Sequence, residues 1–332
     1  MTLLALESES LAKAIRRLIL ETIARAKASH VGSCLSIADI LAVLYGQVLN
    51  VRSNEPSWLE RDRVILSKGH AAVAIYATLA ECGFFPKTWL DTYSQDGSLL
   101  GGHVSWGVPG VEAATGALGH GLNIGAGLAI AFKRAQALAL RAGSSPAFKT
   151  AQASALRAGP SPAFKTAQPN PSGLHDAKDS SHTASQWPKP ATPIRTYVIL
   201  SDGECDEGST WEAALFAAHH GLNNLMAIVD YNKIQSFGRV DEVLKLEPFA
   251  DKWRAFGWHV IDVDGHDHAA LLAAFEHAKT IQDKPQVLIA HTTKGKGVGF
   301  MEDDNLWHYR PPNSEQLVLA LEGLNSEDEG YA

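Results

Sequence analysis

Two short polar motifs, each at the end of an apolar run, carry residue types that bind a hard cation. Asp202 follows one apolar run, and Asn232 follows a second one thirty positions later. Two buried parallel strands of an open α/β sheet would place both side chains at its carboxyl edge, where such sheets bind ligands. A carboxylate, a carboxamide and the main-chain carbonyl of Ile234 suit Mg²⁺, which usually sits on substrate phosphates. The spacing therefore predicts a magnesium–diphosphate site, in which Gly203 lets the diphosphate approach the backbone.

The same residues also have a purely structural interpretation, a strand–turn–helix in which Asp202 caps the helix. Asp-Gly turns after strands are common, so this pattern alone does not decide between the two. Nucleotide-binding motifs are disfavoured. The run 116–121 is not Gly-x-Gly-x-x-Gly after a strand, and the run 295–299 lacks the Gly-Lys-Ser/Thr ending of a P-loop.

Length and composition bound the class of protein. The chain has 332 residues, 45% hydrophobic and 20% charged, which is enough for one large α/β domain or two smaller ones. A formal charge of −7 argues against nucleic acid as a main partner. We find no run of eighteen apolar residues and no secretion signal, and we therefore expect no membrane span. The odd, scattered cysteines are typical of reduced thiols in the cytoplasm: Cys34, Cys82 and Cys205.

Hydrophobic periodicity predicts strands that alternate with helices, and therefore an α/β fold with a mostly parallel central sheet and helices on both faces. Residues 8–28 read as an amphipathic helix. A second helix is predicted from Ser36 to Val48, with Ser36 as N-cap and Asp39 completing an acidic capping box. The other predicted elements are strands at 63–66, 197–200, 226–229, 259–263 and 287–290, and helices at 71–81, 119–132, 248–256 and 267–279.

The segment 134–195 interrupts this rhythm. Residues 137–152 and 153–168 are identical at fourteen of sixteen positions, a tandem duplication too short to stack as a solenoid. We expect one diphosphate-binding domain over residues 1–332, interrupted by a partly disordered, low-complexity surface insertion. The first copy can extend the preceding helix as far as Gly143, and a docking arm is the alternative interpretation of the insertion.

Six ordered motifs resemble the transketolase family, specifically its N-terminal half, which binds thiamin diphosphate. The resemblance runs from about residue 8 to 315 and is broken only by the insertion. It departs from the family at Ser201, where the Gly-Asp-Gly signature has its first glycine. The motifs are the histidine loops 28–33, 67–70 and 101–103, the glycine turn 116–121, the metal motif 201–208 with Trp211, and the loop 291–297 with Trp307 and His308.

The resemblance implies a role for each matching residue. The catalytic residues it implies are histidines, which move protons to and from sugar hydroxyls near pH 7: His30, His70, His103 and His308. The implied cofactor is thiamin diphosphate with Mg²⁺, for which Ca²⁺ or Mn²⁺ can substitute, and the implied metal ligands are Asp202, Asn232 and the Ile234 carbonyl. The implied cofactor-binding residues are His70, Gly116, Leu118, Gly203, Glu204, Asn232 and His308. The glycines of the turn 116–121 also suit close helix packing.

The resemblance further implies a missing half, because a full transketolase has a second domain with the glutamate that activates the pyrimidine ring. We expect no further sheet after His308. The chain is therefore interpreted as one subunit of a split transketolase, which works on sugar phosphates as a heterotetramer with a separate C-terminal-type subunit. Such an enzyme moves a two-carbon ketol unit from a ketose donor to an aldose acceptor. The alternatives are a 1-deoxyxylulose-5-phosphate synthase-like enzyme, the α chain of a 2-oxoacid dehydrogenase, or a catalytically degenerate interaction subunit.

Overall fold

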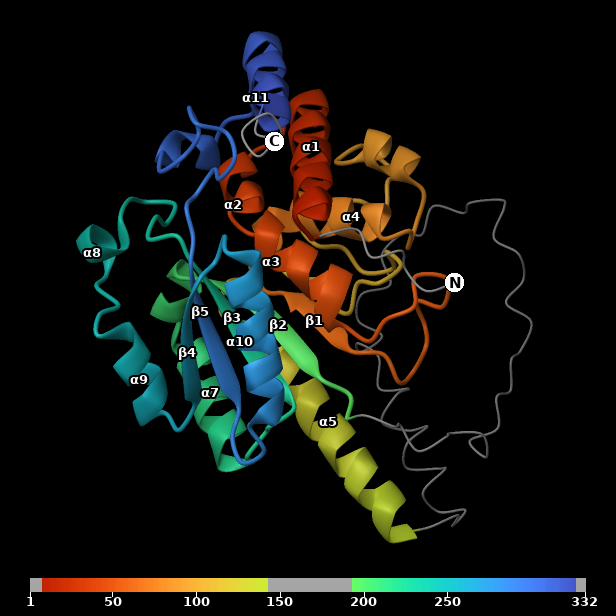
Figure 1. The fold of residues 1–332 in the computed structure, drawn as a ribbon, viewed down its shortest axis with the longest axis vertical. Helices are drawn as coiled ribbons and strands as arrows, with labels where there is room; N and C mark the ends of the chain where they lie inside the picture. Colours follow the sequence, from red (N-terminus) through yellow and green to blue (C-terminus); the bar gives the residue numbers. More distant parts are fainter. Residues whose placement is uncertain (1–7, 143–192, 327–332) are drawn as a thin grey trace.

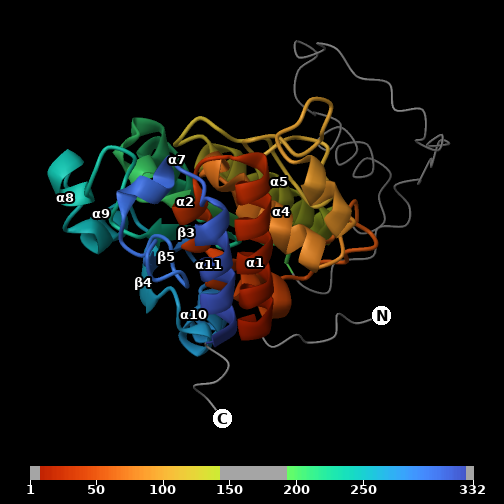
Figure 2. The ribbon, with the colours of Figure 1, turned by 90° about the horizontal axis from the view of Figure 1, so that it is seen from above.

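The computed structural model describes residues 8–142 and 193–326, so most of the expected insertion lies outside the described residues. Within them, a central sheet of five parallel strands is covered by helices on both faces (Figures 1 and 2). The strands lie in the order β1-β2-β3-β5-β4, and all pair in parallel. This confirms the predicted α/β fold. The strands are β1 (Arg63–Leu66), β2 (Thr196–Ser201), β3 (Leu225–Tyr231), β4 (His259–Asp264) and β5 (Gln286–His291).

The apolar runs form strands because they are buried on both sides. Every residue of β1, β2 and β3 is buried, as expected for the centre of a parallel sheet between two helical layers. The register pairs Ser201 of β2 with Asp230 of β3. The polar residues that follow these two strands, including Asp202 and Asn232, are therefore neighbours at one edge of the sheet.

The two helical layers pack on alternate side chains of the strands and form two hydrophobic cores. One core holds Ile199 and Ile228, and the other holds Val198 and Ala227, as the period of two requires. The first layer contains α1 (Ser8–Ala26), α3 (Ala38–Val43), α4 (Ala72–Glu81) and α10 (His268–Thr280). The second contains α5 (Gly121–Ala142), α7 (Gly208–His219) and α9 (Phe249–Ala255).

Shorter elements at the carboxyl edge of the sheet position the polar loops. Helix α11 (Ser314–Ser326), which periodicity did not predict, runs beside α1 (Figure 2). The remaining elements are α2 (Val31–Leu35), η1 (Leu44–Val48), η2 (Gly69–Ala71), η3 (Lys87–Thr92), η6 (Gly203–Asp206), α8 (Val240–Val243) and η7 (Asn305–His308).

The predicted capping box at Ser36 is wrong. Ser36 ends α2, and Ile37 precedes α3 without a side-chain cap. The Ser36 hydroxyl instead donates to the carboxylate of Asp230, at 2.7 Å. Asp39 accepts a bidentate pair of hydrogen bonds from Arg16. Tertiary partners therefore took both side chains away from the local capping role.

One stretch corrects the expectation that no segment is apolar enough to span a membrane. Val31–Val48 passes that test by length and composition, with a mean hydropathy of 1.6. However, 89% of it is buried inside the fold, as in a core helix. The apolar surface of this stretch is therefore already covered by the protein itself.

Helix α5 offers a matched pair of glycines. A Cβ at Gly125 would lie 2.3 Å from Cγ2 of Val198 on β2, whereas a Cβ at Gly127 would meet nothing within 4 Å. We expect Gly125→Ala to destabilise the chain by about 1–3 kcal/mol through overpacking. Gly127→Ala should raise stability by up to about 1 kcal/mol, because alanine is the better helix former. Urea unfolding of the two variants checks this, and equal shifts would contradict the proposed α5–β2 contact.

Candidate cofactor site and histidine cluster

Asp202 and Asn232 lie where the sequence predicted, directly after β2 and β3. Asp202 is 1% exposed, and its two carboxylate oxygens accept hydrogen bonds from the backbone N–H groups of Gly203 at 2.8 Å and Lys233 at 2.7 Å. Burial first, and then the nearby Asp230, raise the pKa of Asp202 to about 7. A carboxyl group in this state gains from the arrival of a cation.

A tight turn brings the third predicted ligand to the same place. Lys233 has a φ of 67°, a left-handed conformation between Asn232 and Ile234. The turn directs the Ile234 carbonyl toward the Nζ of Lys294, which donates to it at 3.0 Å. Lys294 is 1% exposed, and burial lowers its pKa to about 8 against the opposing effect of Asp202. A buried cationic side chain therefore already contacts one of the predicted metal ligands.

The four predicted histidines form one cluster. The ring of His30 lies 5.2 Å from that of His70, 6.1 Å from that of His103 and 5.0 Å from that of His308. They come from four separate loops, so only the tertiary fold brings them together. The backbone N–H of His30 donates to the His308 carbonyl at 2.9 Å, which ties the first of these loops to the last.

The backbone of His30 is unusual, with a φ of 75° just before α2. Non-glycine residues seldom adopt this region, although histidine tolerates it better than most. Such conformations persist where the surrounding structure fixes them, and they gather at functional sites. Here the cap position turns the imidazole of His30 toward the other three rings.

Burial keeps the cluster neutral. It is the largest cause that lowers the pKa of His30 to about 4 and that of His308 to about 3, and the charge of Lys294 adds to both shifts. The pKa of His70 also lies well below its ordinary value, for the same first reason. Neutral imidazoles can accept protons at pH 7, which a site for sugar hydroxyls requires.

The glycine turn at 116–121 packs against the start of η6. Gly119 has a φ of 80°, and a Cβ there would lie 2.7 Å from Cβ of Glu207. Glu204 is fully buried, and its oxygens accept hydrogen bonds from Gly119 N–H at 3.0 Å, Ser201 N–H at 2.9 Å and the Ser67 hydroxyl. The observed contacts of Glu204 therefore brace the turn, and its predicted contact with the cofactor stays a prediction.

The other predicted cofactor residues lie around this turn. Gly116 is exposed and Leu118 is half-buried. A Cβ at Gly116 would come within 3.5 Å of the His103 ring, so the turn and the histidine cluster adjoin. Gly203 is half-buried and has room for a Cβ, with its nearest neighbour, the side chain of Gln235, at 3.4 Å.

Comparison with known proteins gives the family. The family model for the transketolase thiamine diphosphate binding domain matches residues 7–150 and 173–321. The chain belongs to the transketolase family. One chain of an apulose-4-phosphate transketolase from Actinobacillus succinogenes, named as a subunit, is 38% identical over 97% of both chains. A 6-deoxy-6-sulfo-D-fructose transketolase subunit from a Clostridium species is 35% identical over 95% of both chains.

A solved transketolase is similar in fold as well as in sequence. The structure from Campylobacter jejuni matches with a TM-score of 0.76 and 28% identity. That match covers 96% of this chain and 42% of the other, so this transketolase-family chain spans less than half the length of that transketolase.

Several buried polar residues of the site in this transketolase-family chain were not predicted from the sequence. Lys294 and Lys68 stand inside the family motifs, yet only their histidine neighbours received a role. Both lysines are 1% exposed. The available signal was a lysine directly after a buried strand, a place where a solvated side chain is not expected. The others are Ser33, Ser36, Asp230 and Thr292.

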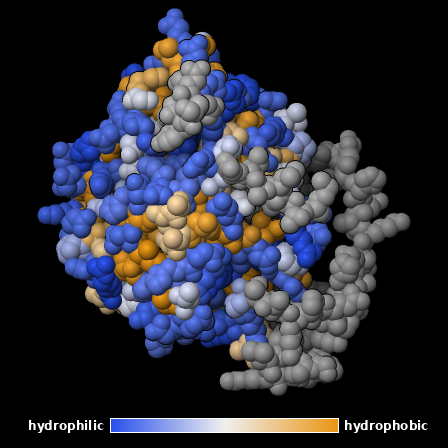
Figure 3. All heavy atoms as spheres, in the orientation of Figure 1, coloured by the Kyte–Doolittle hydropathy of each residue, from blue (hydrophilic) through white to orange (hydrophobic). Residues whose placement is uncertain are grey.

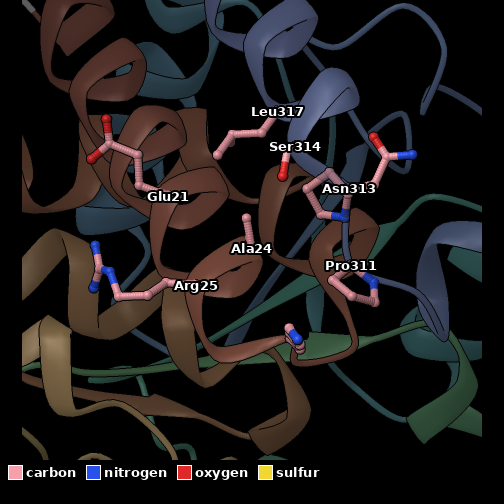
Figure 4. A pocket seen from close by; sticks show the side chains of 9 residues that line it. Glu21, Ala24, Arg25, Pro311, Asn313, Ser314 and Leu317 are labelled. Carbon is pink, nitrogen blue, oxygen red and sulfur yellow. The ribbon is translucent and has the colours of Figure 1, made fainter.

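An open cleft of ≈ 700 Å³ lies between α1 and the segment that leads into α11 (Figure 4). None of the predicted site residues lines it. Arg25 on this cleft already pairs with Asp91, at 2.8 Å. The chemistry of this transketolase-family chain is therefore assigned to the histidine cluster and not to this cleft.

The lowered histidine pKa values make stability depend on pH. Below about pH 6.5 the unfolded chain protonates these histidines, whereas the native chain keeps them neutral down to about pH 4. Their contribution to stability is therefore complete above pH 6.5 and falls as the pH drops through that window. We expect His30→Asn/His308→Asn to lose less stability than the wild type between pH 7.5 and 5.5. Urea unfolding without cofactor checks this, and parallel losses would contradict it.

Proposed function

We propose that this chain is the thiamin diphosphate-binding subunit of a two-chain transketolase that transfers a two-carbon ketol unit between sugar phosphates in the cytoplasm. One observation carries the proposal: Lys294 interacts electrostatically with Asp202 and also with His30 and His308. The predicted metal ligands and the predicted proton-transfer groups therefore belong to one site. The family match to a diphosphate-binding domain supports the choice of cofactor.

The residues present fit a divalent cation. Asp202, Asn232 and the Ile234 carbonyl offer three hard oxygen donors of the kind Mg²⁺ prefers. The raised pKa of Asp202 and the ammonium group on the Ile234 carbonyl both indicate a place that lacks positive charge. We propose that these three groups hold Mg²⁺, with Ca²⁺ or Mn²⁺ as substitutes, and that Lys294 then faces the diphosphate.

The bound cofactor supplies the carbon chemistry, and the side chains of this subunit position the substrate and move protons. His30, at the centre of the cluster, is neutral and can take a proton from a sugar hydroxyl. His103 and His70 lie within reach to orient that hydroxyl, and Ser33 contacts Nδ1 of His308 at 3.3 Å. Gly116 and Leu118 form the wall against which the flat ring of the cofactor packs.

We propose that a C-terminal-type subunit completes the site, in a heterotetramer of two chains of each kind. Hydrophobic side chains are exposed beside the loop that holds Asn305, the partner of Lys294: Phe237 at 86%, Leu306 at 42% and Phe300 at 40%. A separate chain with complementary apolar residues would cover them. The face shown in Figure 3 is mostly hydrophilic, with hydrophobic side chains gathered near its middle.

A calorimetric titration with thiamin diphosphate tests the proposal. The chain is titrated with and without Mg²⁺, alone and mixed with the product of the neighbouring gene as the candidate partner. Saturable binding that needs Mg²⁺ and both chains supports the function, and ketose phosphate formation without release of carbon dioxide separates it from a 2-oxoacid dehydrogenase. Mass measurement of the mixture should give two chains of each kind. Absence of binding in every mixture would refute the cofactor assignment.

A further inference from the structure

A buried ion pair joins the carboxyl ends of two strands that are not neighbours. Lys68 follows β1 and Asp230 lies in β3, with β2 between these strands. The side chains are 1% and 0% exposed, and Nζ of Lys68 donates to Oδ2 of Asp230. Lys68 also donates to the Ser33 carbonyl at 2.8 Å, in the loop after His30.

The Asp230 carboxylate gathers hydrogen bonds from several segments. Its Oδ2 accepts from the Ser36 hydroxyl at 2.7 Å and from Nδ2 of Asn232 at 2.9 Å. Its Oδ1 accepts from the hydroxyl of Thr292, just after β5. The carboxylate therefore ties the loops after β1, β3 and β5 to helix α2.

This arrangement is not explained by stability alone. A buried ion pair often contributes no more than well-packed apolar residues of the same size, because both charges must leave water. What the pair does provide is a fixed, acceptor-only carboxylate beside Asn232. A carboxamide has an NH₂ end and a carbonyl end, and only the NH₂ end can bond to a carboxylate. Asp230 thus determines which end of Asn232 is left for another ligand.

We propose that Asp230, with Lys68 as its counter-ion, is a positioning residue that holds the Asn232 carboxamide with its oxygen toward the divalent cation. This inference rests on the proposed function, because it takes Asn232 as a metal ligand. Residues i and i+2 of an extended strand share one face, which allows a residue in β3 to orient the ligand that follows it. Without the carboxylate, the amide is free to turn its NH₂ end toward the cation, which repels it.

The test is a double-mutant cycle on the Mg²⁺ concentration that gives half-maximal thiamin diphosphate binding, measured with the partner chain. Asp230→Asn should raise that concentration by about 10–100-fold, the usual effect of removing a group that orients a metal ligand. Asn232→Ala should raise it at least as much. In the Asn232→Ala background, Asp230→Asn should have no further effect. Multiplying effects would overturn the proposal, because a merely structural role does not depend on Asn232.

A milder variant covers the case in which Asp230→Asn does not fold. Thr292→Val keeps the ion pair and removes only a hydroxyl donor from Oδ1. It should raise the Mg²⁺ requirement in the wild-type background and leave it unchanged beside Asn232→Ala; an equal rise in both backgrounds overturns the proposal. If the wild type needs no Mg²⁺, the proposed function and this inference both fail. If Asn232→Ala loses Mg²⁺ dependence but the cycle multiplies, only the inference fails.

Discussion

Asp202→Asn is expected to weaken Mg²⁺-dependent binding of thiamin diphosphate by more than about a hundredfold, since even groups that only orient a metal ligand cost about 10–100-fold when removed. The change keeps the shape of the side chain but removes its charge. It also turns an NH₂ group toward the backbone N–H of Gly203 or of Lys233, both of which now donate to the carboxylate. Isothermal titration with and without Mg²⁺ measures the loss.

Asp206→Asn is the matched control. Asp206 lies four residues later in η6, is half-buried, and accepts from Gln235 at 2.7 Å without contacting the predicted ligands. Its loss should leave the Mg²⁺ dependence nearly unchanged. Because the pKa of Asp202 is raised to about 7, the wild type should also need more Mg²⁺ as the pH falls below 7, since the cation must displace a proton. Equal effects of the two variants would contradict the metal role of Asp202.

The sheet and the carboxyl-edge placement of the site could be predicted because the relevant signals are local. Uninterrupted apolar runs such as 197–200 are typical of strands buried on both faces, and a polar residue directly after such a run must lie at the sheet edge. The same reasoning placed Asp202 and Asn232 correctly relative to each other. It needed only the period of the strands and the parallel order of the sheet.

The parts that could not be predicted depend on partners far away in the sequence. Ser36 has a sequence signature of a helix cap, yet its hydroxyl bonds to Asp230, 194 positions away. Lys68 and Asp230 are each unremarkable as single residues, and only the crossing of β1 over β2 to β3 makes them a pair. The contact between Lys294 and the Ile234 carbonyl likewise depends on a left-handed turn at Lys233, which no glycine announces.

His30→Asn is expected to lower kcat/KM by about 10²–10⁴-fold, the usual contribution of a general acid or base, with little change in thiamin diphosphate affinity. Asparagine is the right replacement because it tolerates the left-handed backbone that His30 adopts at a φ of 75°. The hydrogen bond from its N–H to the His308 carbonyl can therefore remain. The variant then removes the imidazole and keeps the loop.

The control is His219→Asn, at the exposed end of α7, which should leave turnover unchanged. Steady-state kinetics with the partner chain and a ketose phosphate donor, beside a cofactor titration, separate two roles for His30. A fall in kcat with intact cofactor binding identifies proton transfer or substrate orientation. An equal fall in cofactor affinity would instead make His30 part of the cofactor site. Its place among three neutral imidazoles argues for the first outcome, because a neutral ring offers little attraction to a diphosphate but can accept a proton from a sugar hydroxyl at pH 7.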